Sequence, residues 1–152
     1  KELEIRNLKN ILNEEVITNR KPILGICLGM QLLFKVSEEN GNHKGLGWLE
    51  GTVKKFDISP KFRIPHIGWN DLSYTKDDVL FNDINNDKNF YFVHSYYVET
   101  DKKNIIALSN YGIDFVAAVQ KRNIFGTQFH PEKSHINGLT FLKNFYKIIK
   151  DF

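Results

Sequence analysis

The sequence predicts an α/β protein with a mixed central sheet, on three observations. A short apolar run ends in Gly-Ile-Cys-Leu-Gly at residues 25–29 and leads into an amphipathic segment, which is typical of a strand that turns sharply into a helix. Many short runs rich in aromatic and β-branched residues follow, as expected for strands. Residues 138–150 close the chain as an amphipathic helix. This order favours an α/β sheet with an antiparallel extension.

The first part of the chain predicts two helices on either side of the cysteine turn. Apolar residues at helical spacing indicate an amphipathic helix over residues 1–19 with no strand before it. After the turn, the pattern predicts a helix over residues 28–36, with Leu32 and Leu33 facing the core. Glycine and polar residues at 41–47 interrupt the pattern.

The remainder predicts mostly strands. We expect strands at 46–56 and 62–66, a polar loop with a short helical turn at 76–88, a strand pair over 89–98 around His94, and strands at 104–109, 114–120 and 123–129. The closing helix should bury Leu139, Leu142, Phe145, Ile148 and Ile149.

Size and composition fit one globular domain over residues 1–152. The chain has 41% hydrophobic residues for a core and 26% charged residues for a surface. Its net charge is only +3, and its lysines alternate with acidic residues over 54–87. This pattern argues against nucleic acid as a main ligand, because nucleic-acid sites gather positive charge.

The single cysteine, Cys27, cannot form an internal disulfide, so the fold does not depend on an oxidising compartment. No apolar run approaches the roughly 20 residues that span a bilayer, and no signal-peptide pattern is present. We therefore expect a cytoplasmic protein without membrane contact. No residues have convincing zinc spacing, so we expect no metal and no cofactor.

The strongest chemical signal combines Cys27 with His130 and Glu132. The Gly-x-Cys-x-Gly turn is a nucleophile elbow with sulfur in place of oxygen, and a helix N-terminus should favour the thiolate. About a hundred residues later, the run Gly-Thr-Gln-Phe-His-Pro-Glu-Lys-Ser at 126–134 supplies an imidazole and a carboxylate. A thiol nucleophile needs a base, and the base needs an orienting group. We predict these three residues as a catalytic triad.

These motifs resemble the class I (triad-type) glutamine amidotransferases. Within that family, Pro-His-Ile-Gly-Trp-Asn at 65–70 and Tyr-Phe-Val-His-Ser-Tyr-Tyr at 91–97 are similar to the glutaminase subunits of imidazole glycerol phosphate synthases. The resemblance runs from residue 22 to the C-terminus. It implies a flavodoxin-like three-layer fold and hydrolysis of glutamine to glutamate and ammonia through a cysteine thioester. It also implies a heterodimer in which a (β/α)8-barrel synthase (cyclase) subunit receives the ammonia for histidine biosynthesis.

The resemblance also implies roles for individual residues. The backbone N–H of Leu28 would stabilise the oxyanion, and Trp69 and Lys133 would lie on the face that docks the synthase. The residues expected to contact the amino-acid end of glutamine are Gln31 and Glu39, on the helix after the elbow, with Ser95 and Tyr96. Ordinary structural roles are the alternative for each, such as a solvated charge at Glu39 or a core aromatic at Trp69. His66 and His94 are expected to be structural hydrogen-bonding residues.

Family members carry an opening strand, a first helix and a glycine-rich loop that supplies a second oxyanion donor. The sequence begins at Lys1 rather than Met, and none of these features precedes the first predicted helix. We therefore expect an N-terminally truncated chain that is weakly active or inactive alone and less soluble than a restored one.

Two other functions fit the same residues. One is a paralogous glutaminase subunit that feeds a surface-polysaccharide sugar amidotransferase, which residues 45–51 and 133–135 resemble somewhat. Its triad would be the same, so the residues leave the ammonia acceptor open. The other is a non-catalytic glutamine-binding or partner-binding module.

Overall fold

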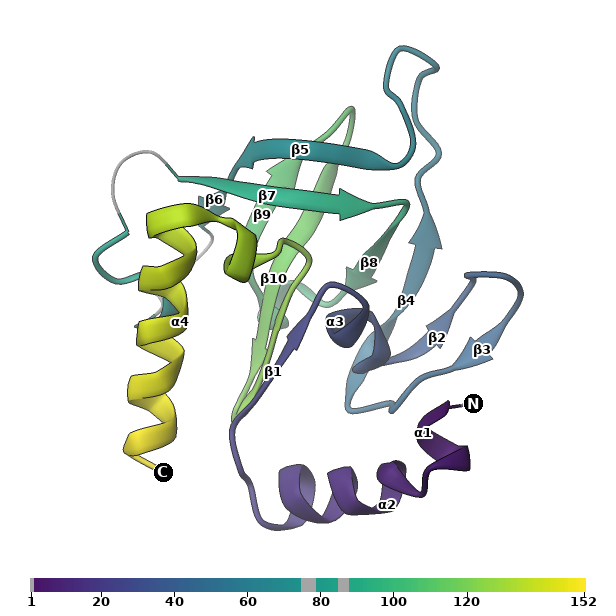
Figure 1. Cartoon of the computed structure of the whole chain (residues 1–152). Helices are drawn as coiled ribbons and strands as arrows, with labels where there is room; N and C mark the ends of the chain where they lie inside the picture. Colours follow the sequence, from purple (N-terminus) through teal and green to yellow (C-terminus); the bar gives the residue numbers. More distant parts are fainter. Residues whose placement is uncertain (1, 75–78, 85–87) are drawn as a thin grey trace.

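The computed structural model describes residues 2–74, 79–84 and 88–152 (Figure 1). The largest sheet has the strand order β1-β11-β10-β9-β6, formed by Ile23–Ile26, Ile124–Thr127, Asp114–Lys121, Ile105–Asn110 and Ser73–Tyr74. β1 runs parallel to β11, and the other neighbours are antiparallel. The predicted mixed sheet is therefore confirmed.

The other strands of the described residues form two smaller sheets. One has the order β3-β2-β4-β8, formed by His43–Lys44, Phe34–Ser37, Leu49–Lys55 and Tyr96–Thr100. The other pairs β5, His66–Asp71, with β7, Asn89–His94. Figure 1 shows the β5–β7 ribbon lying across the end of the molecule where β1 leads into α3.

The helices are short except the last. They are α1, α2, the π-helix η1, α3 and α4, at Glu2–Ile5, Leu8–Leu12, Asn13–Thr18, Leu28–Leu32 and His135–Lys150. Three single turns of 3-10 helix are η2, η3 and η4, at Val79–Phe81, Lys102–Asn104 and Pro131–Lys133.

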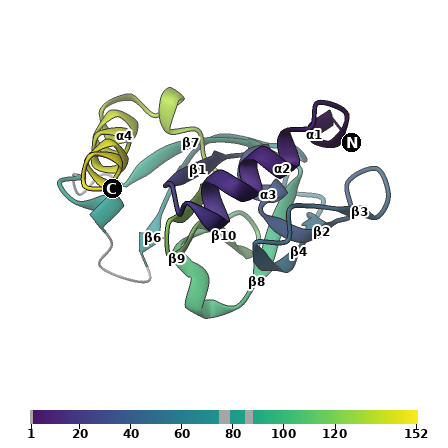
Figure 2. The same cartoon turned by 90° about the horizontal axis from the view of Figure 1, so that it is seen from below.

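The central sheet has a hydrophobic core on each face, because successive strand residues point to opposite sides. On β10, Phe115 belongs to a cluster that includes Phe141 of α4, whereas its neighbour Val116 belongs to a second cluster that includes Met30 of α3. Figure 2 shows α4 well separated from α2 and α3. The expected three-layer α/β arrangement is confirmed.

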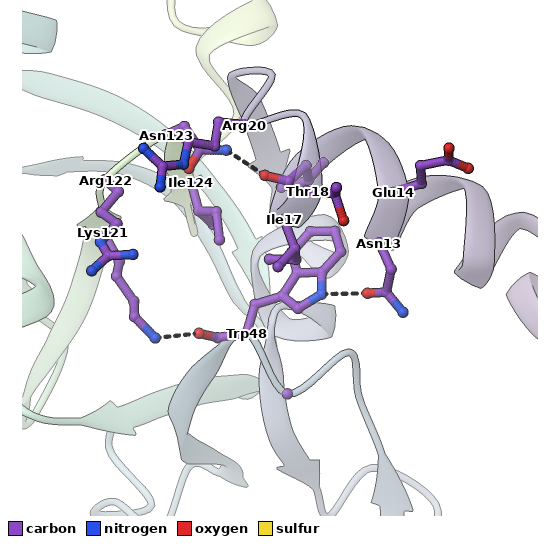
Figure 3. Close-up of a pocket in the computed structure, with 12 residues that line it drawn as sticks. Asn13, Glu14, Ile17, Thr18, Arg20, Trp48, Lys121, Arg122, Asn123 and Ile124 are labelled. Atoms are coloured by element: carbon purple, nitrogen blue, oxygen red, sulfur yellow. Dashed lines mark hydrogen bonds between the residues drawn. The ribbon is translucent and has the colours of Figure 1, made fainter.

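The N-terminal segment is helical as predicted, except for a break at Asn7, whose φ is 55°. Hydrogen bonds connect it to the residues just before β4 and β11 (Figure 3). Trp48 Nε1 donates to Asn13 Oδ1 at 2.8 Å, and Asn123 Nδ2 donates to Val16 O at 2.8 Å. A cavity of about 630 Å³ lies between this segment and the residues that start β11, and Cys27 is not part of its lining.

The predicted helix over residues 28–36 was too long. It ends at Leu32, and Phe34–Ser37 form β2, which pairs in parallel with β4. Leu33 is buried as expected, but Leu32 is exposed. Aromatic and β-branched residues fit a pleated sheet when a partner strand is available, so pairing with β4 overrides the helical pattern.

The strand predictions are largely confirmed, with two exceptions. Residues 89–98 contribute to two strands as predicted, but β7 pairs with β5 and β8 pairs with β4, in different sheets, so the two do not form a pair with each other. Residues 62–65 are exposed and outside any strand, and the strand predicted there begins at His66 and runs to Asp71. Its partner is β7, with His66 opposite His94. In the predicted loop, η2 forms the short helical turn, whereas residues 76–78 and 85–87 lie outside the described part of the chain.

The closing helix begins at His135, three residues earlier than predicted, and its buried face differs. A Cβ at Gly138 would lie 1.8 Å from Pro131 O, so the helix contacts η4 at that point. Phe141, one turn on, is fully buried, and Phe145 and Ile148 pack against the same core. Leu139 and Ile149 fall outside this stripe and are exposed, so their predicted burial was wrong.

Among the described residues, no helix is both long and apolar enough to cross a membrane.

Candidate functional site

Cys27 occupies the sharp turn between β1 and α3, as the elbow motif predicts. Its backbone has φ 50° and ψ −106°, a conformation that L-residues rarely adopt, and its N–H donates to Thr127 O at 2.7 Å. A Cβ at Gly25 would lie 2.6 Å from the backbone of Gly29, so position 25 requires glycine. A Cβ at Gly29 would meet open space. The motif therefore needs one of its two glycines, and Cys27 itself carries the strained conformation.

The position of the Cys27 thiol raises its pKa overall. Burial raises its pKa above the ordinary value; the Leu28 N–H and the Gln128 amide act in the opposite direction, and the carboxylates of Glu132 and Glu39 raise it further. The backbone N–H at the N-terminus of α3 therefore favours the thiolate as predicted, but desolvation of the thiol is the larger effect. Chemistry at this thiol requires a base.

His130 and Glu132 form a directly bonded pair. The Nδ1 atom of His130 lies 2.7 Å from a carboxylate oxygen of Glu132, so Nδ1 carries a hydrogen and donates it. The other ring nitrogen, Nε2, is buried and has no hydrogen-bond partner in the part of the chain that the structure describes. In the neutral ring this atom is a proton acceptor, which is what a general base requires.

The strand β7 brings Cys27 and His130 to one place. Cys27 Sγ lies 3.7 Å from Val93 O, and the His130 N–H donates to Tyr91 O at 2.8 Å. Residues two apart in a strand are separated by about 6.6 Å. The predicted nucleophile and base therefore border the same stretch of β7, although they are 103 positions apart in the chain.

A cavity of about 300 Å³ opens beside Cys27. Its lining includes every residue that the sequence predicts to contact glutamine, and the full set is Cys27, Leu28, Gln31, Glu39, Pro65, Val93, His94, Ser95 and Tyr96. Its volume is at the small end of ligand sites, which suits a ligand of amino-acid size.

One of these residues is placed differently from the prediction, and another already uses part of its hydrogen-bonding capacity within the protein. Glu39 lies in the turn that follows β2, not on the helix after the elbow, and its N–H donates to Ser37 Oγ at 3.3 Å. Gln31 is on α3 as predicted, but its Nε2 already donates to Tyr96 O at 3.1 Å and to Gln128 Oε1 at 3.0 Å. Only its carbonyl oxygen is left to accept a hydrogen bond from a ligand.

Sequence reasoning missed Gln128. Its side chain is fully buried, and its Nε2 donates to Cys27 Sγ at 3.5 Å. The available signal was an amide in an otherwise apolar run two positions before His130. Buried amides are normally hydrogen-bonded, so such a residue indicates a polar partner inside the fold.

His66 and His94 form a buried pair, as their predicted structural role requires. His94 Nδ1 lies 2.8 Å from Tyr96 O, and His66 Nδ1 lies 3.0 Å from His94 Nε2. A carbonyl only accepts, so His94 carries its hydrogen on Nδ1 and its Nε2 accepts from His66. Burial lowers the pKa of each ring to about 4, and both are neutral at pH 7.

Trp69 and Lys133 lie on one face, next to Glu132. The Trp69 indole is 44% exposed and stacks on the His135 ring, with centroids 4.8 Å apart and planes 2° apart. Lys133 Nζ lies 5.9 Å from the centroid of the Tyr91 ring, which contacts Trp69 edge-on at 6.0 Å. Trp69 is therefore a surface aromatic rather than a core residue.

No group of three His, Cys, Asp or Glu side chains within residues 2–74, 79–84 and 88–152 is arranged to hold a metal ion.

Comparisons with known proteins identify the family of the chain. The profile of the family described as "Glutamine amidotransferase class-I" matches residues 4–149. The chain is 49% identical over 142 residues to the imidazole glycerol phosphate synthase subunit HisH of Leptospira borgpetersenii, covering 91% of this chain and 69% of that protein. It is 49% identical over 150 residues to subunit HisH 2 of Vibrio vulnificus, covering 99% of this chain and 70% of that protein.

Solved structures show the same fold at lower identity. A glutamine amidotransferase from Thermotoga maritima matches with a TM-score of 0.62 and 17% identity, covering 97% of this chain and 56% of that one. Another glutamine amidotransferase matches with a TM-score of 0.64 and 17% identity, covering 95% of this chain and 71% of that one. With a family match over almost its whole length and an elbow cysteine beside a paired histidine and glutamate, the chain belongs to the class I glutamine amidotransferases.

Proposed function

We propose that this chain is the glutaminase subunit of an imidazole glycerol phosphate synthase, and that it hydrolyses glutamine to glutamate and ammonia. The observation that carries the proposal is the partly buried thiol of Cys27 in the wall of a cavity of amino-acid size, near a histidine whose tautomer is set by Glu132. The similarity to HisH subunits supports the choice within the family.

The first half-reaction forms a thioester. His130 Nε2 takes the proton of the Cys27 thiol, and the thiolate attacks the side-chain amide carbon of glutamine. The Leu28 N–H donates to the resulting oxyanion; losing such a donor typically costs roughly 10² to 10³ in rate. When the tetrahedral intermediate collapses, the C–N bond breaks and His130 returns the proton to nitrogen, so that ammonia leaves.

The second half-reaction restores the enzyme. His130 takes a proton from a water molecule as its oxygen attacks the thioester carbon. The carbon–sulfur bond then breaks, glutamate is released, and His130 returns the proton to the Cys27 sulfur. Glu132 accepts the Nδ1–H of His130 and stabilises the imidazolium that forms in each half.

The cavity provides groups for the amino-acid end of the substrate. The Glu39 carboxylate and the free carbonyl oxygen of Gln31 suit the α-ammonium group, since both only accept hydrogen bonds. Ser95 and Tyr96, which also line the cavity, would donate hydrogen bonds to the α-carboxylate.

Two further elements complete the proposal. A synthase subunit with a (β/α)8 barrel would dock on the face of Trp69 and Lys133 and receive the ammonia. In the central sheet, β1 pairs with β11 on one side only among the described strands. Its other edge can accept a further strand, and a loop following such a strand would end next to Cys27 and could donate the second oxyanion hydrogen bond.

The test is covalent labelling by a diazoketone analogue of glutamine, read as intact mass with peptide mapping. We expect one adduct at Cys27, on this chain or on a version extended at its N-terminus, and no adduct on Cys27→Ser. Labelling only of the extended chain would show that the further strand is required. No labelling of either version, even with a candidate synthase present, would contradict the proposed glutaminase function.

A further inference from the structure

A chain of hydrogen bonds connects the buried histidine pair with the sulfur of Cys27. It starts at His94 and passes through the Tyr96 carbonyl, the Gln31 amide and the Gln128 amide to Cys27 Sγ, and each link is 3.5 Å or shorter. Gln128 and His94 are buried, and Gln31 is 7% exposed. The proposed reaction uses Cys27 but gives no role to Gln128.

The carbonyl of Tyr96 decides how both amides are oriented. This oxygen can only accept, and the atom of Gln31 that faces it at 3.1 Å must therefore be Nε2. The second hydrogen of that nitrogen points to Gln128, 3.0 Å away, so Gln128 must present Oε1 there. The other end of the Gln128 amide is then its NH₂ group, which faces the sulfur.

His94 keeps the Tyr96 carbonyl in place. Its Nδ1–H is a second donor to the same oxygen at 2.8 Å, and His66 fixes the tautomer of His94 from the other side at 3.0 Å. The backbone of Gln128 is held independently, because its N–H donates to Ala117 O at 2.8 Å. Neither end of the Gln128 side chain is free to turn.

We infer that Gln128 is a positioning residue for the nucleophile: its amide, locked by Gln31 and the Tyr96 carbonyl, donates to Cys27 Sγ and stabilises the thiolate over the thiol. The neutral thiol has its own partner, since it donates to Val93 O at 3.7 Å. A thiolate loses that bond but still accepts from the Gln128 amide and the Leu28 N–H, besides the imidazolium that His130 becomes in the proposed reaction. Because partial burial disfavours the charged sulfur, such donors offset part of its desolvation.

This inference rests on the proposed function only in taking Cys27 as the nucleophile, and its test needs no glutaminase activity. The probe is iodoacetamide, which alkylates the thiolate, and the rate constant at Cys27 is measured from pH 6 to 10 on the whole chain. For Gln128→Leu we expect a higher apparent pKa of Cys27 and alkylation about tenfold slower at pH 7, with a similar limiting rate at high pH.

The matched control is Gln120→Leu. Gln120 lies on β10, opposite Phe125, and is absent from the cavity lining, so this variant should retain the original profile. Gln31→Met, which removes the group that orients Gln128, should shift the profile in the same direction as Gln128→Leu. If Gln128→Leu fails to fold, the Gln31→Met variant provides the test instead.

The direction of the shift separates positioning from a merely structural role. Loosening of the site would admit water to the thiol and lower its pKa, because burial is the main cause that raises it. An unchanged or lowered pKa in Gln128→Leu, or in Gln31→Met if the first variant is unfolded, would overturn the inference. Labelling by the diazoketone analogue is scored separately, so a failure of the glutaminase proposal would be recognised as such.

Discussion

His66 Nδ1 lies 3.0 Å from His94 Nε2, inside an aromatic core in which Phe56, Phe92 and Phe115 surround the pair. With His94 bound to Tyr96 O through its Nδ1–H, the pair has one hydrogen between the two rings. An additional proton would place a charge in a buried site.

The first prediction concerns stability at low pH. Burial lowers the folded pKa of each ring to about 4, below the ordinary histidine value of 6.5, so the unfolded chain binds more protons between these values. The free energy of unfolding should therefore fall as pH decreases from 6.5 toward 4, by roughly 1.4 kcal/mol per pH unit for each histidine. Urea unfolding at several pH values measures the slope.

Variants test whether this pH dependence of the unfolding free energy comes from His66 and His94. His66→Gln should reduce it, since one of the two shifted groups is gone. His43, an exposed histidine whose Nε2 lies 3.2 Å from Asn40 O, supplies the control, and His43→Gln should keep the full slope. Equal slopes for the two variants would contradict the assignment.

The second prediction concerns the two glycines of the elbow. Gly25→Ala should destabilise the chain by about 1–3 kcal/mol or more, because its Cβ would lie 2.6 Å from the Gly29 backbone. Gly29→Ala meets open space within a helix, where alanine is favoured over glycine by about 1 kcal/mol, so its stability should be unchanged or higher. Thermal unfolding of the two variants side by side measures both effects, and a similar loss in both would show that the backbones do not approach as closely as described.

The third prediction concerns the turn after β2. Glu39→Gln should raise the KM for glutamine at least tenfold with a smaller change in kcat, because it removes a charge that faces the substrate ammonium in the proposed complex. Glu38 is an exposed neighbour outside the cavity lining, and Glu38→Gln should have kinetics close to the parent chain. Steady-state glutamate release, with a synthase subunit present, is the measurement. A loss confined to kcat would place Glu39 in the chemistry rather than in substrate binding.

The fourth prediction concerns the proposed docking face. Trp69→Ala should weaken binding to the synthase subunit by about 2 kcal/mol, or roughly 30-fold, because exposed aromatics at the centre of an interface carry much of its affinity. Tyr146, another exposed aromatic on α4, offers the matched control Tyr146→Ala, with an expected affinity equal to the parent. Binding measured by calorimetry would contradict the proposed face if both variants bound equally well.

The sequence alone determined the parts of this protein that depend on local patterns. The elbow at Cys27 and the His130–Glu132 pair could be predicted because each motif is a few residues long, and the strands from 89 to 129 followed from short apolar runs between turns. It also indicated which residues would line the cavity, through resemblance rather than through geometry.

Only the tertiary structure decided the remainder. Phe34–Ser37 became a strand because β4 was available as a partner, which moved Glu39 from a helix to a turn. The orientation of the Gln128 amide depends on a carbonyl 32 positions away in the chain, and the net pKa of Cys27 depends on burial by strands that follow it. Strand pairing, desolvation and hydrogen-bond direction depend on contacts between segments that are distant in the sequence. They are therefore set only when folding brings those segments together.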